Sequence, residues 1–199
     1  MLNNVSFRVN KGDKIGFVAE NEMAMTTLFK ILMGEMEPDE GYYKWGQTIT
    51  TSYFPHDNTA FFEGSSMRII DWLGQYTTEE TETYLRSFLG RMLFSGDDVY
   101  KEVQMLSGGE KVRCMLSRMM MFSANVLVVD QPTDHLDLES ITAVNNGLID
   151  FKGNILFASH DHEFMQTLAN RIIELTDDGV IDRLSTFDEF IAYKARLNA

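Results

Sequence analysis

The chain has 199 residues, of which 44% are hydrophobic and 24% are charged, a composition typical of one globular domain or of a domain with a small subdomain. Asp and Glu outnumber Lys and Arg by 30 to 17, so the formal net charge is −13. This charge excludes a large basic surface for nucleic acid or anionic membrane, and it argues against direct DNA binding.

The sequence lacks the features of membrane insertion and of export. No run of about 18 apolar residues occurs, as a membrane-spanning helix needs. The amino terminus does not show the basic, apolar and small-residue order of a signal peptide. These observations predict a cytoplasmic protein with no membrane insertion.

The cysteine and histidine content predicts neither a disulfide nor a metal site. Cys114 is the single cysteine, and beside Met115 and Leu116 it is expected to be a small buried apolar side chain. The four histidines are too scattered along the chain to indicate a metal centre.

Hydrophobic periodicity divides the first third of the chain into strands and one helix. Alternating apolar residues predict a half-buried strand that ends at a turn containing Gly12. A short apolar run then predicts a buried strand, and apolar residues at helical spacing before Pro38 predict a helix. In chain order, the predicted elements are a strand at 5–9, a strand at 13–19, a helix at 26–36 and an extended segment at 42–54.

The remainder changes from helical segments to alternating strands and helices. Predicted helices at 67–76 and 79–94 lie within an inserted helical subdomain. The later elements are a helix at 110–121, a buried strand at 126–130, a helix at 140–149, a strand at 154–158, a helix at 163–170, a hairpin of 172–175 with 180–183, and a helix at 187–197. The alternation predicts an α/β layered domain with a mainly parallel sheet.

A serine and two glycines stand immediately before the predicted helix at 110–121. A serine caps a helix start well, and exposed backbone N–H groups at a helix N-terminus bind anions. Alone, this string is equally well explained as an ordinary helix cap. Its residues are Leu106, Ser107, Gly108, Gly109 and Glu110.

Later polar segments make the pattern specific. The buried strand 126–130 ends in Asp130-Gln131, and a second strand is followed by Ser159-His160-Asp161. In this order, the segments resemble the ATP-binding cassette (ABC) family over nearly the whole chain. The resemblance implies a P-loop NTPase-like ABC ATPase domain that binds ATP with Mg²⁺.

The resemblance assigns a role to each segment. Residues 106–110 match the signature motif, which contacts ATP in trans, and 126–131 match the Walker B strand. His135 to Asp137 match the D-loop, and His160 matches the switch histidine. The sequences of 132–140 and 159–164 resemble those of the ABC-F group. This group comprises soluble tandem-domain ATPases, many of which act on the ribosome.

The resemblance also implies catalytic and metal-binding roles. Asp130 would hold Mg²⁺ and His160 would contact the terminal phosphate. The family places a glutamate after the Walker B aspartate to polarise the attacking water, whereas this chain has Gln131. An amide is not an anionic base, and loss of general-base help costs about 10²–10⁴-fold. Hydrolysis at this position is therefore predicted to be strongly impaired.

The phosphate loop departs further from the family. The spacing G-x-x-x-x-G-K-[ST] falls on residues 19–26, between a predicted strand and a predicted helix. Only the metal-contacting hydroxyl of Thr26 remains. Met25 replaces the lysine, and Glu22 adds a negative charge where the family usually has glycine. The predicted degenerate nucleotide-binding residues are Ala19, Asn21, Ala24, Met25, Thr26 and Thr27.

These replacements predict a weakened nucleotide site. A lost charged hydrogen bond is worth roughly 1.5–3 kcal/mol, and each decade of affinity is about 1.4 kcal/mol. With the strain of alanines in glycine-type positions, two or more decades of affinity are expected to be lost. The alternative is a plain strand-to-helix turn that binds no nucleotide.

Two further positions differ from the family. His56 stands at the Q-loop position, where the family has glutamine, although it equally fits a surface loop. The family's first strand and its adenine-stacking aromatic precede the segment that matches Leu2 to Val5, so we expect the chain to be a fragment or the second half of a longer protein. The expected parts are 1–57 and 106–199 for the ATP-binding core and 58–105 for the helical subdomain.

Three functions remain open at this point. The first is a regulatory ABC-F half that lends its signature loop and D-loop to a partner cassette upstream in the same protein, with the ribosome as a contact of the whole protein. The second is the ATP-binding subunit of an ABC transporter. The third is a dimerisation module without a nucleotide role.

Overall fold

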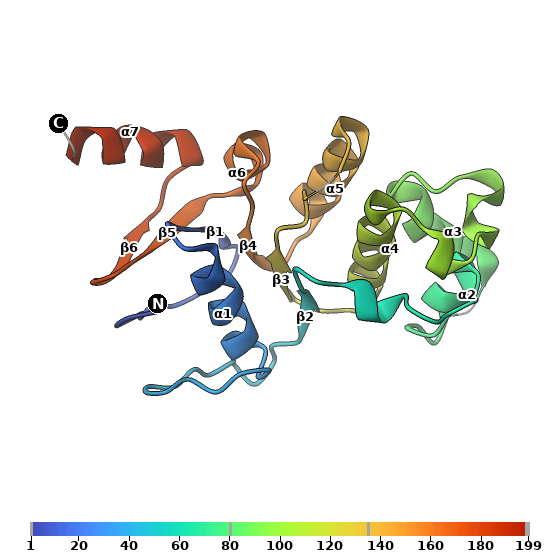
Figure 1. Cartoon of the computed structure of the whole chain (residues 1–199), viewed down its shortest axis with the longest axis horizontal. Coiled ribbons are helices and arrows are strands. Elements are labelled where there is room, and N and C mark those ends of the chain that lie inside the picture. Colours follow the sequence, from blue (N-terminus) through green and yellow to red (C-terminus); the bar gives the residue numbers. More distant parts are fainter. Residues whose placement is uncertain (1, 80, 135, 198–199) are drawn as a thin grey trace.

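The computed structural model describes residues 2–79, 81–134 and 136–197, which form a six-stranded sheet with helices around it (Figure 1). The strand order is β2-β3-β4-β1-β5-β6, and every neighbouring pair is parallel except β5 with β6. The mainly parallel α/β sheet is therefore confirmed. The strands are β1 Lys14–Ala19, β2 Thr51–Phe54, β3 Val126–Asp130, β4 Asn154–Ala158, β5 Arg171–Thr176 and β6 Gly179–Arg183.

Helices cover both faces of the sheet, which explains why its central strands are apolar throughout (Figure 1). Helix α1 packs on one face, where Leu28 and Phe29 contact Phe17 and Val128 in one apolar cluster. On the other face, α4, α5 and α6 enclose a second cluster that contains Phe157. The helices are α1 Glu22–Leu32, α2 Ile69–Gly74, α3 Glu82–Arg91, α4 Gly108–Met121, α5 Leu138–Asp150, α6 His162–Leu168 and α7 Phe187–Leu197.

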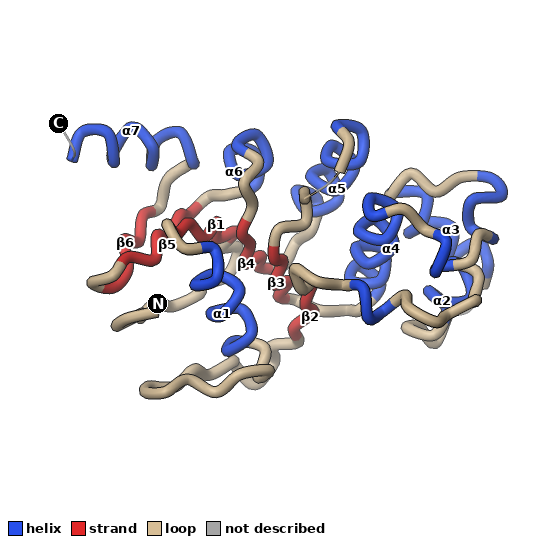
Figure 2. Tube along the Cα trace, viewed as in Figure 1, coloured by secondary structure: helices blue, strands red, loops and turns tan. Residues whose placement is uncertain are grey.

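The helices between β2 and β3 gather at the β2 end of the sheet, as the helical insertion predicts (Figure 2). Trp72 of α2 anchors this part, stacking on Phe62 with ring centroids 5.1 Å apart and donating its indole N–H to the Phe61 carbonyl. The division of the chain at residues 57 and 105 stays a prediction.

The later predicted elements agree with the structure. The strands at 126–130 and 154–158, the hairpin and the helix at 187–197 are all confirmed. The helices predicted at 67–76 and 79–94 exist but are shorter, at 69–74 and 82–91. Cys114 is fully buried, as predicted, and burial raises the pKa of its thiol well above the ordinary value.

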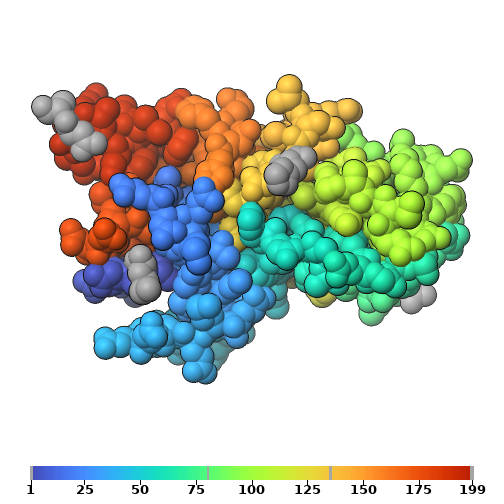
Figure 3. All heavy atoms as spheres, viewed as in Figure 1, coloured from blue at the N-terminus to red at the C-terminus, as the bar shows by residue number. Residues whose placement is uncertain are grey.

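Three early elements differ from the prediction. Residues 5–9 alternate between half-buried and exposed but form no strand, because no described segment pairs with their backbone. Only 51–54 of the predicted 42–54 segment is a strand, and residues 33–50 (light blue) project at the lower left (Figure 3). The first helix spans 22–32 instead of 26–36, because the Asn21 side chain caps it by accepting from the Met23 N–H.

Membrane insertion was not expected from the sequence. Among the residues that the structure describes, none of the helices has the length and apolar character to cross a membrane.

A buried ion cluster joins the starts of β1 and β5 to β6. Arg171, 7% exposed, donates from Nη1 to Asp13 Oδ2 at 2.6 Å and from Nε to Asp182 Oδ1 at 2.8 Å. Hydrogen bonding to Asp182 raises the pKa of the Arg171 guanidinium. The same side chain donates to the Arg8 carbonyl and so holds the amino-terminal segment.

Replacing Arg171 with Met is expected to lower the free energy of unfolding by about 3–5 kcal/mol, because the buried Asp13 carboxylate loses its partner. Urea denaturation measures the change. Arg196→Met, at an exposed arginine on α7, is the control and is expected to change stability by less than about 0.5 kcal/mol. An equal effect of the two substitutions would contradict the role of the cluster.

Candidate functional site

The candidate site lies at the carboxyl ends of β1, β4 and β3, which are adjacent because the strand order is β3-β4-β1. Ligands of open parallel sheets bind at this edge. Asn21, His160 and Gln131 follow the three strands, so segments more than 100 residues apart in sequence meet there. We call this edge of the sheet the carboxyl edge.

Thr26 and Asp130 form a direct contact at the carboxyl edge. The Thr26 hydroxyl donates to Asp130 Oδ2 at 2.8 Å, which joins the first turns of α1 to the end of β3. Asp130 is fully buried, and its second carboxylate oxygen has no protein hydrogen-bond partner among the described residues. Burial raises the pKa of the Asp130 carboxyl, and the Thr26 hydrogen bond opposes this rise.

The first turn of α1 lacks a cation. Met25 takes the lysine position and is only 4% exposed, because its side chain packs into the apolar cluster between α1 and the sheet. Ala24 is buried in the same cluster, whereas Ala19 and Thr27 are half-buried and Asn21 is exposed. The loop therefore serves as a capped strand-to-helix turn whose methionine contributes to the core.

Gln131 and His160 lie within hydrogen-bonding distance of each other, because β3 and β4 pair and end side by side. Gln131 Nε2 is 3.1 Å from His160 Nε2, and the same imidazole nitrogen is 3.2 Å from Glu22 Oε1. With its proton on Nε2 the ring donates to the Glu22 carboxylate, and with its lone pair there it accepts from the Gln131 amide. The structure thus unites the two predicted catalytic residues and adds Glu22 to them.

Gln131 adopts an unusual backbone conformation. Its φ is +51°, in the left-handed region that side chains other than glycine rarely adopt. Its N–H donates to the Ala158 carbonyl at 3.0 Å, and its side chain is 6% exposed with Oε1 unpartnered within the described part of the chain. Such strain is found where the surrounding structure fixes a residue at a site.

His56, at the predicted Q-loop position, contacts the segment that follows β3. Its Nε2 lies 3.3 Å from Asp134 Oδ2, and the side chain is 55% exposed. The contact connects the loop after β2 to the polar segment after the Walker B position. The predicted D-loop residue His135 lies outside the described residues.

The predicted signature residues form a complete helix cap at the start of α4. Ser107 Oγ accepts from the Glu110 N–H at 3.3 Å, and Glu110 Oε2 accepts from the Ser107 N–H at 2.9 Å. This reciprocal pair is a capping box. Burial alone raises the pKa of the Glu110 carboxyl, but hydrogen bonds from Ser107 and Lys101 outweigh it and lower the pKa. Gly108 is exposed, and a Cβ added there would meet no atom within 4 Å.

The D-loop and the signature segment are neighbours. A Cβ on Gly109 would lie 3.3 Å from Leu136 Cδ2. Asp137 caps α5 by accepting from the Ser140 N–H at 2.8 Å, and this hydrogen bond lowers the pKa of the Asp137 carboxyl. Each segment therefore ends in a cap of the helix that follows it.

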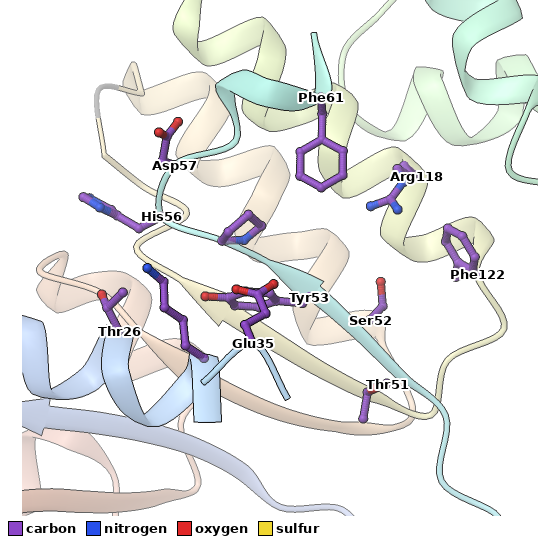
Figure 4. Close-up of a pocket in the computed structure, with 12 residues that line it drawn as sticks. Thr26, Glu35, Thr51, Ser52, Tyr53, His56, Asp57, Phe61, Arg118 and Phe122 are labelled. Atoms are coloured by element: carbon purple, nitrogen blue, oxygen red, sulfur yellow. The ribbon is translucent and has the colours of Figure 1, made fainter. Parts of the chain in front are cut away.

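A cavity of about 560 Å³ opens beside the carboxyl edge, between α1, β2 and α4 (Figure 4). Arg118 lies between Phe61 and Phe122 in this cavity, and its guanidinium carbon is 5.0 and 5.1 Å from the two ring centroids. The Tyr53 hydroxyl is buried without a described partner, and burial strongly raises its pKa. Thr26 and His56 also line the cavity, so it adjoins the site.

A family model described as "ABC transporter" matches residues 2–134 of the chain. The chain belongs to the ATP-binding cassette family. Members of this family bind ATP, generally with Mg²⁺, and their cassettes pair with a second cassette.

Curated relatives are much longer than this cassette. The uncharacterized ABC transporter ATP-binding protein YkpA of Bacillus subtilis (strain 168) is 59% identical over 192 residues, which are 96% of the chain and 36% of that protein. The energy-dependent translational throttle protein EttA of Escherichia coli (strain K12) is 30% identical over 98% of the chain and 36% of its own length. The chain therefore spans about a third of these relatives.

A solved structure supports the fold. The dimeric bacterial ABC transporter cassette MJ0796 has a TM-score of 0.73 at 17% identity and covers 92% of this chain and 90% of its own. At this identity the likeness shows the fold alone, and it confirms the P-loop NTPase-like ABC architecture.

The residues at the carboxyl edge fit the Mg²⁺ ion of a magnesium nucleotide but not its phosphate groups. The Thr26 hydroxyl and the unpartnered oxygen of Asp130 are donors of the type that Mg²⁺ takes. The phosphate position does not fit, because Met25 offers no ammonium and a Glu22 carboxylate stands at the helix start. The phosphates of a nucleoside triphosphate would meet the Glu22 carboxylate and would lack the lysine ammonium that the family supplies.

The sequence alone did not identify four residues at this site. Glu22 was predicted only as an unfavourable charge, and Asp134, Tyr53 and Lys30, a further residue lining the cavity, were not assigned to the site. Their places depend on strand order and on the path of the loop after β2, which no local spacing encodes. The sequence did show that Glu22 stands where the family usually has glycine, and this difference could have pointed to Glu22 as a residue of the site.

Replacing Asp130 with Asn is expected to raise the free energy of unfolding near pH 7 in the absence of Mg²⁺. The pKa of Asp130 is raised in the folded state, so its charged carboxylate destabilises the fold once the pH is above 3.8, the ordinary pKa of an aspartate. Well below that pH the carboxyl is protonated in both the folded and the unfolded state, and this cost disappears. The gain should therefore shrink as the pH is lowered toward about 4.

Urea denaturation at the two pH values measures this gain. Asp39→Asn, at an exposed loop aspartate, is the matched control and should show no comparable gain. A gain of the same size at both pH values would show that the buried charge is not its cause.

Proposed function

We propose that this cassette is the degenerate, regulatory half of a tandem ABC-F-type ATPase, and that it supplies its signature loop and D-loop to ATP held by a second cassette of the same protein. Its own pocket holds nucleotide weakly or not at all and contributes little hydrolysis. The observation that carries the proposal is a contrast between two faces of the domain.

The carboxyl edge is poorly suited to ATP. Met25 is buried in the core in place of a phosphate-binding lysine, and Gln131 replaces the carboxylate expected to polarise water. His160 Nε2 lies within hydrogen-bonding distance of both Glu22 and Gln131, so this ring nitrogen has one partner at the edge in either protonation state. These contacts support an inactive pocket.

The signature face keeps its predicted chemistry. Ser107 and Glu110 close a full capping box, and Gly108 leaves open space above the first turn of α4. The free N–H groups of a helix start favour an anion, which in a paired cassette would be the partner's ATP. The length of the relatives, about three times this chain, supports a second cassette in the same protein.

The likeness to EttA, whose name describes a translational throttle, supports the ABC-F assignment and a ribosomal contact of the whole protein. The charge of −13 supports a main RNA-binding surface elsewhere in such a protein. A second candidate, the ATP-binding subunit of a transporter, is favoured by the name of YkpA. A nucleotide-independent dimerisation module is the third.

Replacing Gly108 with Asp in the full-length protein is expected to reduce ATP turnover at least tenfold. The new side chain fits without a clash, but its charge would face the partner's ATP. Gly90→Asp is the matched control, because Gly90 is also an exposed helical glycine with open space at its Cβ.

Turnover and thermal unfolding are measured on all three proteins. Loss of turnover in Gly108→Asp alone, with unchanged unfolding, supports donation of the signature loop in trans. Unchanged turnover and ATP affinity would overturn it and favour the dimerisation module. Stimulation of turnover by a membrane partner, and not by ribosomes, would favour the transporter subunit.

A further inference from the structure

The start of α1 carries its own anion at the position where P-loop proteins bind phosphate. Helix α1 has 11 residues and begins at Glu22, directly after β1 and the cap residue Asn21. A helix N-terminus presents free N–H groups and a positive dipole end, both of which favour a negative charge. Asn21 already accepts from two of these donors, the Met23 N–H through its side chain and the Ala24 N–H through its carbonyl, so the Glu22 carboxylate adds negative charge to a helix start that is partly capped.

Glu22 reaches across the carboxyl edge to the neighbouring strand ends. Its Oε1 lies 3.2 Å from His160 Nε2, and His160 Nε2 lies 3.1 Å from Gln131 Nε2. Because β4 lies between β1 and β3, the three side chains form a continuous row over the ends of the three strands. We call Glu22, His160 and Gln131 the edge row.

Two buried acceptor atoms, one on Asp130 beneath the edge row and one on Gln131 within it, have no partner among the described residues. Asp130 is fully buried with Oδ1 unpartnered, and Gln131 is 6% exposed with Oε1 unpartnered within the described residues. Both free atoms are acceptors, so they add to the negative potential at the edge. Met25, buried in the core, supplies no compensating charge.

The geometry points to Glu22 as an internal anion that takes the place of a nucleotide's phosphate. Its carboxylate occupies the favourable end of the α1 dipole and engages the His160 ring. An incoming phosphate would have to displace this carboxylate and approach Asp130 as well, so the site rejects anions by charge. Glu22 is thereby a specificity-determining residue of this pocket. The inference rests on the proposal that the pocket holds nucleotide poorly, and it names the cause.

This role differs from that of an ordinary glutamate in a first helical turn. Glu82, at the same position of α3, pairs with Arg86 of its own helix at 2.7 Å, and Glu139 in the first turn of α5 forms no ion pair among the described residues. Glu22 pairs with a histidine from another strand end although its side chain is 71% exposed. Solvent at that exposure screens the charge, so a moderate effect is expected.

The test is a titration with orthophosphate at constant ionic strength, followed by the ring resonances of His160 in the histidine-labelled chain. The His160→Gln variant identifies those resonances. In Glu22→Gln, half-maximal response is expected at a phosphate concentration at least about tenfold lower than in the wild-type chain, which corresponds to about 1.4 kcal/mol. Glu139→Gln should titrate as the wild type does, and Glu22→Asp, which keeps the charge, should stay close to it.

An equal response of the wild type and Glu22→Gln overturns the inference, and so does no response in Glu22→Gln while its thermal unfolding matches the wild type. The outcome is separable from that of the proposed function. Glu22→Gln alters only this chain's own pocket, whereas Gly108→Asp probes the trans contact through turnover of the full-length protein. Either experiment can therefore fail while the other succeeds.

Discussion

The parallel pairing of β3 with β4 and of β4 with β1 determines the rest of the site. Because parallel strands end at the same edge, Asp130, His160 and the α1 start come together although they are far apart in sequence. The Thr26 hydrogen bond to Asp130 then ties α1 to β3 across this edge. The contact of Glu22 with His160, and the hydrogen bond from the Gln131 N–H to the Ala158 carbonyl, both depend on the parallel pairing of these three strands.

The carboxyl edge and the signature segment are stabilised in different ways. The carboxyl edge contains buried or strained groups, such as the unpartnered Asp130 oxygen and the positive φ of Gln131. The signature segment instead satisfies its own N–H groups through the Ser107 and Glu110 capping box. The cap of the signature helix therefore uses contacts other than those of the carboxyl edge.

The departures from the family motif also have a folding role. Met25 fills the apolar cluster between α1 and the sheet, where a lysine would need an anion to offset its burial. Glu22 suits the positive end of the α1 dipole and contacts His160. Both replacements are consistent with a loop that maintains the strand-to-helix turn in the absence of bound phosphate.

The sequence by itself determined the order of the elements from residue 126 onward and the ABC motifs, because periodicity and spacing are local properties, and it predicted a weakened phosphate loop. It misplaced the start of α1, since the Asn21 cap competes with the apolar pattern, and it predicted a strand at 5–9 that has no described partner. Only the tertiary structure decided that Glu22 meets His160, that His56 meets Asp134 and that Arg171 joins three strands. Those contacts follow from strand order and loop paths, which bring together residues that no sequence window contains.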